Sequence, residues 1–420
     1  MNYQETMDWL SRRPILAMEN GVARVRWMLD KLGQPQLRLP TVHFVGTNGK
    51  GSTLNALQAI FQASGYTVGR FTSPSIIDYR EQIVYQNQMI SEEDFAAIVT
   101  DLLPLIEELD QAAGLGAISE FEVLVVVIFV YFADYQRPEI LLVEAGMGGL
   151  LDATNVLSPL VVVCPSIGLD HQNFLGQTHA DIARQKVAVL KPRVPLIYAT
   201  DQLTVTQVFE DYAHDIDSPT FALGREIVLE HGRAGFAVTT PYGEVSDLTL
   251  AMQGCHQEAN AALAVMTAQV LSDRFPAIQP QTIRQGLSQA IWPGRQELIL
   301  PNLLIDGAHN NESIAVLTDL LREQYSDKKI AFLFAAINTK PVDQMLEALS
   351  QYGPVTVTSF DDVRAVELAD YPAGYARAER FQDWLAQADL DNPDKIYVIT
   401  GSLYFIAQVR KYLVEHFLSS

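Results

Sequence analysis

Short apolar runs alternate with longer amphipathic stretches along most of this chain. Such alternation is typical of parallel β-strands joined by helices, and it predicts an α/β fold. Amphipathic helices are predicted over residues 92–110 and 180–190, for instance. The first series of predicted strands is Val42–Val45, Thr67–Phe71, Ile140–Glu144, Leu160–Cys164 and Pro195–Ala199.

The pattern changes near residue 227. Short alternating segments with turns over residues 227–250 predict β-hairpins, and an alanine-rich helix is predicted over residues 257–271. A second α/β series follows, with strands predicted at Leu303–Asp306, Ile330–Ala335, Val355–Phe360 and Ile396–Thr400. We therefore expect two domains. Residues 1–294 would form a P-loop-type, mostly parallel sheet domain that binds ATP, and residues 295–420 a smaller Rossmann-like α/β domain.

Length and composition agree with a soluble protein of more than one domain. A chain of 420 residues exceeds the size of one ordinary domain. The longest apolar run, residues 123–133, is too short to span a bilayer and is expected to be a buried helix or strand. The first residues carry charges and no apolar signal segment, and the two cysteines are far apart in sequence. We expect a cytoplasmic protein with reduced cysteines and no membrane partner.

The net charge of −21 limits the partners further. An acidic surface repels phosphate backbones, so nucleic acid is not expected as a partner. Small anionic substrates would have to be bound by local lysines, arginines, helix N-termini and Mg²⁺.

A glycine-rich segment, Gly46-Thr47-Asn48-Gly49-Lys50-Gly51-Ser52, joins the first predicted strand to a helix. Glycines in such a turn let backbone N–H groups approach phosphate oxygens, and the helix dipole favours negative charge there. Lys50 adds a full positive charge, and Ser52 or Thr53 offers a hydroxyl to Mg²⁺. Gly51 stands where the common Walker pattern has Ser or Thr, which argues against ordinary P-loop kinases, GTPases and helicases.

Further residues with chemical potential follow other predicted strands. Glu144 closes one strand and is a candidate metal ligand, and His171 follows another and is a second candidate. Asp306 and His309 follow a strand of the second domain and are candidates for nucleotide contacts. Arg295 lies in the segment between the two α/β patterns, where it would reach a terminal phosphate.

The motifs, in their order, resemble those of folylpolyglutamate synthases and dihydrofolate synthases, the folate branch of the Mur ligase superfamily. The resemblance runs through almost the whole chain. Besides the phosphate loop it rests on Thr72-Ser73-Pro74, Ser119-Glu120-Phe121-Glu122, Leu151-Asp152-Ala153-Thr154-Asn155, Asp170-His171, Gly176-Gln177-Thr178, Asn260, Asp306-Gly307-Ala308-His309-Asn310 and Gly401-Ser402-Leu403-Tyr404. A member of this family would bind ATP in the larger domain, with the substrates between the two domains.

The resemblance implies roles for single residues. Lys50 would hold the β- and γ-phosphates of ATP, and Glu144, His171 and Lys186 would join it in catalysis. The other nucleotide contacts would come from Thr47, Asn48, Gly49, Gly51, Ser52, Thr53, Asn260, Arg295, Asp306 and His309. Two Mg²⁺ ions would be bound by Ser52, Ser73 and Glu144 and by His171 and Lys186, the last carbamylated. The folate and glutamate substrates would contact Ser73, Pro74, Phe121, Asp152, Ser402 and Tyr404.

The chemistry that this family implies is ATP-dependent amide ligation. A carboxylate of the folate attacks the γ-phosphate, ADP leaves, and the amine of L-glutamate attacks the resulting acyl phosphate. The leading hypothesis is addition of glutamate to the γ-carboxyl of a reduced folate. The relatives are often monomeric, so we expect a monomer with small-molecule substrates only.

Departures from the family pattern keep alternatives open. Gln82 and Leu150 stand where relatives have arginine, and Thr339-Lys340-Pro341 replaces Asp-Lys-Asp. The rival activities are dihydrofolate synthesis from dihydropteroate, a bifunctional enzyme, and a divergent ligase acting on another acid. A nucleotide-binding protein without catalysis is a further alternative, which the intact Glu144, His171 and Lys186 disfavour. An NAD-dependent Rossmann enzyme is disfavoured because no G-x-G-x-x-G segment opens a helix.

Overall fold

The chain divides into two units in the computed structural model, which describes residues 1–14, 20–75, 78–112, 114–232, 235–252, 254–292 and 294–418. The first unit comprises Met1–Ala251 and Gln257–Ala290, and the second comprises Met252–His256 and Ile291–Ser420. Within the described residues, every helix is too short or too polar to cross a lipid bilayer.

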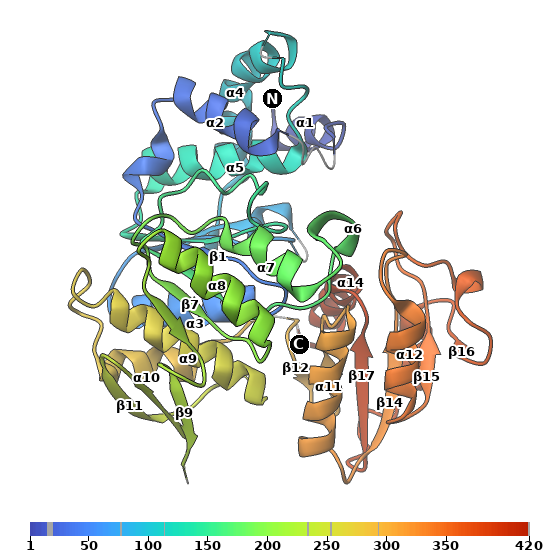
Figure 1. Ribbon diagram of the computed structural model, residues 1–420. Coiled ribbons are helices and arrows are strands. Elements are labelled where there is room, and N and C mark those ends of the chain that lie inside the picture. Colours follow the sequence, from blue (N-terminus) through green and yellow to red (C-terminus); the bar gives the residue numbers. More distant parts are fainter. Residues whose placement is uncertain are drawn as a thin grey trace. The chain divides into compact units, whose positions relative to one another are not determined.

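An eight-stranded sheet forms the centre of the first unit (Figure 1). Its neighbours are parallel except at one edge, where β3 and β4 join antiparallel. Strand β1 lies between β5 and β6, so the loops that follow these three strands emerge side by side. The strands in spatial order are β4 (Gln88–Met89), β3 (Ile83–Tyr85), β2 (Val68–Phe71), β5 (Ile140–Glu144), β1 (Thr41–Phe44), β6 (Val161–Cys164), β7 (Leu196–Tyr198) and β8 (Thr220–Ala222).

Helices cover both faces of this sheet because alternate side chains of its central strands point to opposite sides. Leu141 and Val143 pack against α1 (Tyr3–Leu10), α2 (Gly21–Lys31), α4 (Glu92–Ala112) and α5 (Glu120–Val130) on one face (Figure 1). Ile140 and Leu142 pack on the other face against α3 (Lys50–Ala63), α9 (Cys255–Val270) and α10 (Pro280–Gln289). Helices α7 (His179–Val187) and α8 (Leu203–Asp215) pack against β6 and β7.

A small antiparallel sheet joins this core. Its order is β11 (Gly243–Leu248), β10 (Phe236–Thr240) and β9 (Val228–His231), which confirms the predicted hairpins. Val238 and Val245 pack into the same apolar cluster as α9 and α10.

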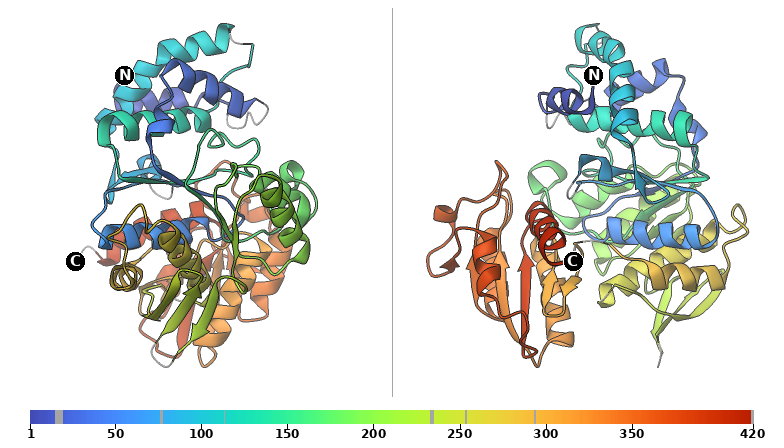
Figure 2. Two further views of the ribbon diagram at one scale, coloured as in Figure 1. Left: turned by 60° about the vertical axis from the view of Figure 1, so that its left-hand side comes forward. Right: turned by 180° about the vertical axis from the view of Figure 1, so that it is seen from behind.

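The second unit is a six-stranded sheet between two pairs of helices (Figure 2). All its neighbours are parallel except the edge strand β12. Helices α11 (Asn311–Gln324) and α12 (Val342–Ser350) pack on one face, and α13 (Phe381–Gln387) and α14 (Leu403–Leu413) on the other. The strand order is β12 (Glu297–Leu300), β13 (Leu303–Ile305), β17 (Lys395–Thr400), β14 (Lys329–Phe334), β15 (Val355–Val357) and β16 (Ala376–Arg377).

The predicted fold class and central strands are confirmed, and the misses concern short elements. Strands β3, β4, β8, β12 and β16 were not expected, and they have six residues or fewer at or next to sheet edges, where burial leaves little apolar pattern. The apolar run over residues 123–133 is helical, in α5 and the π-helix Tyr131–Gln136 that continues it. Helices α1 and α2 were not predicted.

A buried ion pair connects α2 to the N-terminus of α5. The guanidinium of Arg24 donates from Nε and Nη2 to the two carboxylate oxygens of Glu122, at 2.7 and 2.8 Å. Both side chains are less than 5% exposed. Glu122 also accepts from the backbone N–H of Ser119, whose hydroxyl caps the helix in return. The pair therefore stabilises the first turn of α5, where Phe121 lies.

Removing one partner of this pair leaves the other charge buried and unpaired. We expect Arg24→Ala to lower the free energy of unfolding of the first unit by about 3–5 kcal/mol. Lys31→Ala is the matched control. Lys31 lies on the same helix and pairs with Glu108 at 3.0 Å, but both side chains are about half exposed, and we expect a loss of at most about 1 kcal/mol. Denaturant titration followed by circular dichroism measures both, and equal effects would contradict a structural role for the buried pair.

Candidate functional site

The phosphate loop lies between the carboxyl end of β1 and the first turn of α3. Gly46 and Gly49 have positive φ angles of 140° and 82°, a conformation that favours glycine. The N–H of Thr53 donates to Gly49 O at 2.9 Å, the first bond of the helix. The N–H groups of residues 49–52, just before it, have no partner within the helix and are available to an anion.

The loop that follows β6 holds the phosphate loop in place. Thr47 N–H donates to Ser166 O at 2.9 Å, and Asn48 N–H donates to the Ser166 hydroxyl at 2.9 Å. The Thr47 hydroxyl accepts from Gly168 N–H at 2.9 Å. Because β1 and β6 are neighbours, these short bonds fix the loop before any ligand binds.

Two lysines converge on one backbone oxygen in this loop. Lys50 Nζ donates to Gly46 O at 3.1 Å, and Lys186 Nζ, from α7, donates to the same oxygen at 2.8 Å. Lys186 is only 5% exposed. Lys186, which follows Gly46 by 140 positions in sequence, thus shares one acceptor with Lys50.

Burial and the nearby positive charge change the protonation of Lys186. Burial first, and then the neighbouring charge of Lys50, lowers the pKa of Lys186 to about 7. A large share of the side chain is therefore a neutral amine near neutral pH. An anion bound between the two lysines would relieve their mutual repulsion.

Glu144 is the carboxylate nearest to Lys50. It closes β5, next to β1, and its Oε1 lies 3.7 Å from Lys50 Nζ with a side chain 8% exposed. Ser52 lies on the first turn of α3 and is also buried. One carboxylate and serine hydroxyls are hard oxygen donors that suit Mg²⁺ bound jointly by protein and phosphate. Among the described residues no group of three or more His, Cys, Asp or Glu side chains could hold a metal by itself.

His171 lies farther along the loop that follows β6. It precedes the short helix α6 (Gln172–Leu175) with a positive φ of 52°, and its side chain is 42% exposed. Its N–H donates to Asp170 Oδ1 at 2.8 Å, and its Nε2 lies 3.9 Å from the same oxygen. The Asp170 carboxylate therefore lies near the imidazole but farther than a hydrogen bond. Ser166 and Gly168, which form the clamp on the phosphate loop, precede both residues in the same segment.

Asp152 organises the loop that follows β5. Its carboxylate accepts from the N–H of Met147 at 2.7 Å and from the N–H and hydroxyl of Thr154 at 3.0 and 2.5 Å. The Thr154 hydroxyl also contacts Nε2 of the buried His43 at 2.8 Å. Burial raises the pKa of Asp152 and lowers that of His43 to about 3. The predicted substrate contact of Asp152 is not among these bonds and stays a prediction.

The other residues predicted to contact the acid substrate lie on the loops after β2 and at the start of α5. Ser73 and Pro74, joined by a cis peptide bond, follow β2, and Ser73 is partly buried. Phe121 packs against the glycine after β5, since a Cβ on Gly146 would lie 2.6 Å from its ring. Its ring centroid is 6.0 Å from that of Phe71.

Asn260 reaches the phosphate loop from α9. Its Oδ1 accepts from the hydroxyl of Thr53 at 3.3 Å and would lie 2.6 Å from a Cβ on Gly49. Its Nδ2 donates to Gln257 at 3.2 Å. Asn260 and the loop are therefore brought together within the first unit.

The predicted residues of the second unit surround the carboxyl ends of β13 and β17. Asp306 accepts from the N–H of Gln296 at 2.8 Å and of Ala308 at 2.9 Å, and burial raises its pKa despite the nearby charge of Arg295. His309 Nδ1 contacts Gly307 O at 2.8 Å.

Ser402 and Tyr404 follow β17, which is the strand next to β13 in the sheet. Ser402 is 1% exposed at the N-terminus of α14. The guanidinium carbon of Arg364 lies 4.3 Å from the ring centroid of Tyr404.

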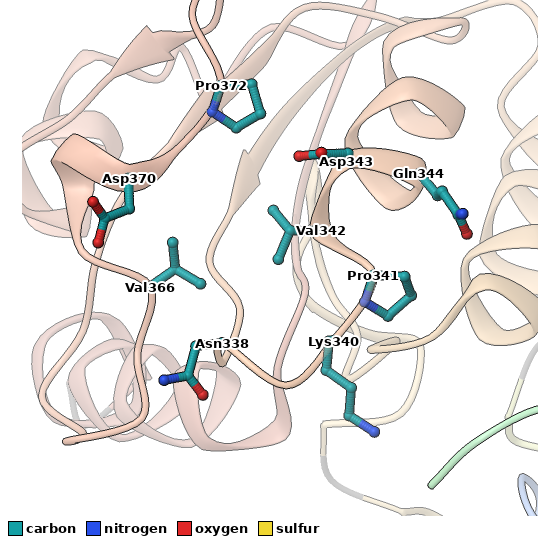
Figure 3. Close-up of a pocket in the computed structure, with 9 residues that line it drawn as sticks. All are labelled: Asn338, Lys340, Pro341, Val342, Asp343, Gln344, Val366, Asp370 and Pro372. Carbon is teal, nitrogen blue, oxygen red and sulfur yellow. The ribbon is translucent and has the colours of Figure 1, made fainter. Parts of the chain in front are cut away.

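A pocket of about 420 Å³ lies elsewhere in the second unit, at the N-terminus of α12 (Figure 3). Lys340 and Pro341, part of the departure from the family pattern, line it together with Asn338 and Asp370. None of the predicted site residues is among its lining residues.

One cation of this region was not predicted. Arg70 lies within β2 and donates to Gln58 of α3 at 3.2 Å. Burial lowers its pKa to about 10, and the carboxylates of Glu81 and Glu144 partly offset this by raising the pKa. Its signal in the sequence is a charged residue inside an apolar strand.

The positive φ of Gly49 and its closeness to Asn260 lead to a test. We expect Gly49→Ala to weaken ATP affinity by about tenfold or more, because the new Cβ displaces Asn260 and distorts the loop. Gly65→Ala, at the other end of α3, is the control. Its φ is 84°, but nothing lies within 4 Å of its Cβ, so backbone strain is matched without displacement. Calorimetric titration with a non-hydrolysable ATP analogue measures both, and equal losses would contradict the stated role of the Asn260 contact.

Comparison with known proteins agrees with the geometry. The C-terminal domain of dihydrofolate synthetase matches residues 300–412. A dihydrofolate synthase/folylpolyglutamate synthase from Bacillus subtilis (strain 168) is 34% identical over 429 residues, covering 98% of this chain and 99% of the relative.

Two solved structures extend the likeness over the whole chain. An FPGS-AMPPCP-folate complex has a TM-score of 0.85 and 31% identity, covering 99% of this chain and 100% of the other. The Mycobacterium tuberculosis folylpolyglutamate synthase complexed with ADP has a TM-score of 0.88 and 27% identity, covering 98% of each chain. This chain belongs to the folylpolyglutamate synthase and dihydrofolate synthase family.

Proposed function

We propose that this protein is an ATP-dependent ligase that adds L-glutamate to the γ-carboxyl of a reduced folate, with ADP and phosphate as the other products. The observation that carries the proposal is the convergence of Lys50 and Lys186 on Gly46 O, with Glu144 3.7 Å from Lys50. The relative solved with AMPPCP and folate supports the nucleotide and the acceptor class. The protein would act as a cytoplasmic monomer on small molecules.

The reaction needs charge neutralisation rather than a protein nucleophile. The folate carboxylate attacks the γ-phosphorus, the bond to the β-γ bridging oxygen breaks, and ADP leaves. The amine of glutamate then attacks the acyl carbon, loses a proton, and expels phosphate. Lys50 and the loop N–H groups oppose the negative charge that would otherwise repel the carboxylate, and the fixed loop holds the phosphates in line.

The protein residues fit Mg²⁺ shared with the phosphates. Ser52, Ser73 and Glu144 would hold a first ion, since a buried carboxylate and serine hydroxyls are hard oxygen donors. His171 and Lys186 would hold a second, provided that Lys186 is carbamylated, because a protonated amine is no ligand. When bound, the ions would draw electron density from the phosphate oxygens and neutralise developing charge. Arg295, Asp306 and His309 would contact nucleotide, and Ser402 and Tyr404 glutamate.

Dihydrofolate synthesis is a second candidate, and a bifunctional enzyme would combine both activities. The Bacillus subtilis relative carries both names. The two reactions share the phosphate chemistry and differ only in whether the acceptor carboxylate belongs to dihydropteroate or to a glutamate already attached.

The proposed function is tested by ADP release. The protein is incubated with ATP, Mg²⁺ and glutamate, and dihydropteroate, tetrahydrofolate or a one-carbon tetrahydrofolate is supplied in turn. We expect ADP only when an acceptor is present, with product mass increased by one glutamyl residue. ADP release that no acceptor changes, or none with any acceptor, would contradict the proposal.

Lys50→Ala tests the phosphate assignment. We expect ATP turnover to fall by about 100-fold or more, because a preorganised cation facing the transferred phosphate is lost. Lys31→Ala, an exposed lysine on α2, is the control and should turn over ATP at the original rate. Normal turnover in Lys50→Ala, with thermal unfolding unchanged, would end the assignment.

The lowered pKa of Lys186 makes carbamylation depend on pH. Only the neutral amine attacks CO₂, forming the N–C bond and releasing one proton, and the neutral fraction rises as pH passes about 7. At constant dissolved CO₂ we therefore expect the ¹³C carbamate signal to grow from pH 6 to 8 in protein given ¹³C-bicarbonate. Lys186→Arg should lose that signal, and a signal equal in both proteins would contradict carbamylation of Lys186.

A further inference from the structure

Arg70 is a charged residue inside β2, and its side chain is held from α3. Its Nη1 donates to Gln58 Oε1 at 3.2 Å. Gln58 is only 4% exposed, and its Nε2 donates to Asn87 Oδ1 at 2.7 Å, so that its oxygen faces the guanidinium. Because α3 begins with Lys50, Arg70 is attached to the helix that carries the phosphate loop.

The register of the sheet places Arg70 beside Glu144. Strands β2 and β5 are parallel neighbours in which Arg70 pairs with Leu142. Glu144 lies two residues farther along β5 and therefore on the same face, the one that packs against α3. Burial lowers the pKa of Arg70 to about 10, and the carboxylates of Glu81 and Glu144 oppose that shift. The guanidinium and the Glu144 carboxylate thus attract each other on this face of the sheet.

Glu144 shares its other cation, Lys50, with the nucleotide. Lys50 Nζ lies 3.7 Å from Glu144 Oε1, and in the proposed function the same ammonium group faces the β- and γ-phosphates. The Glu144 side chain is 8% exposed, so water screens its charge weakly. Arg70 comes from β2 and Lys50 from α3, so Arg70 can stabilise the carboxylate while Lys50 binds phosphate.

Gln82, one of the departures from the family pattern, lies next to Arg70 on the β2–β3 pair. The two strands are antiparallel with Arg70 opposite Val84, and the Thr72 N–H donates to Gln82 O at 3.1 Å. Position 82 is therefore a diagonal neighbour of position 70 on the same face, at about 7–8 Å. Gln82 is neutral and 5% exposed, and its amide donates to Tyr79 O. A guanidinium at either position would reach the same carboxylate.

We propose that Arg70 is a positioning residue for the ligation reaction, which fixes the Glu144 carboxylate beside the phosphate loop and supplies from β2 the cation that relatives have at position 82. The inference rests on the proposed function, in which Glu144 would bind Mg²⁺. Arg70 acts through Glu144 rather than on the substrates. This chain would therefore have moved a fixed positive charge by one diagonal step in the sheet.

The first test measures the binding of a non-hydrolysable ATP analogue by calorimetric titration, without Mg²⁺ and without acceptor. We expect Arg70→Gln to weaken binding by about threefold or more, the effect of one unit charge about 7 Å away in water, because Glu144 then repels the phosphates with less compensation. Arg38→Gln is the control, since Arg38 also pairs with a carboxylate, that of Asp134, but both side chains are about half exposed. Equal affinities of the two variants would overturn the role of Arg70.

The second test moves the cation back. Adding Gln82→Arg to Arg70→Gln should restore the analogue affinity to within about twofold of the original, because the guanidinium stays on the same face. Adding Leu37→Arg instead gives the same net charge at a site that is 55% exposed before β1, and it should restore nothing. Equal affinities of the two double variants would overturn the placement of this cation beside Glu144.

The third test uses Arg70→Lys, which keeps the charge but loses the planar fork of donors and also serves if Arg70→Gln does not fold. We expect the analogue affinity to stay within about twofold and kcat for ADP release to fall by about tenfold, because Glu144 is no longer held in one orientation. A merely structural contribution would lower the temperature of thermal unfolding without this split between binding and kcat.

Unchanged kcat in Arg70→Lys would overturn the positioning role. If the original protein releases no ADP with any acceptor, the proposed function fails instead, and the two binding tests still decide whether Arg70 acts on the phosphate site.

Discussion

The carbonyl oxygen of Gly46 is the point on which the site depends. Lys50 and Lys186 both donate to it, and the first comes from the loop itself while the second comes from a helix that is remote in sequence. When both amines are protonated, two ammonium groups share one neutral acceptor and are poorly compensated, so the arrangement favours an anion. Burial, and then the charge of Lys50, lowers the pKa of Lys186 to about 7.

The topology of the sheet makes this convergence possible. Because β1 lies between β5 and β6, Glu144 and the Ser166–Gly168 clamp emerge on either side of the phosphate loop. Short backbone bonds from the clamp hold the loop, and Asn260 closes it from α9. Glycine is then required at position 49 for two reasons, the positive φ of the turn and the lack of space for a Cβ beside Asn260.

Much of the phosphate site could be predicted from residues that are adjacent in the sequence. The glycine-lysine turn between a strand and a helix, and the carboxylate that closes β5, are both visible in adjacent residues. The contact of Lys186 with Gly46 could not be predicted, since nothing near residue 186 differs from an ordinary helix and only the resemblance drew attention to it. The Arg24–Glu122 pair is likewise a tertiary contact over 98 positions. Short strands at or next to the sheet edges were missed because two to four residues carry no usable periodicity.

Charge is distributed unevenly around this centre. The chain as a whole is strongly acidic, and two arginines of the first unit are already bonded, Arg70 to Gln58 and Arg80 to Asp78. Local groups rather than the net charge of the chain must therefore attract a triphosphate.

A crystal structure with a non-hydrolysable ATP analogue and Mg²⁺ tests the central claim most directly. The account requires phosphate oxygens within hydrogen-bonding distance of Lys50 Nζ and of N–H groups of residues 49–52, with the Glu144 carboxylate directed toward the same phosphates. A triphosphate bound away from this loop, or one that left both lysines bonded to Gly46 O alone, would contradict it.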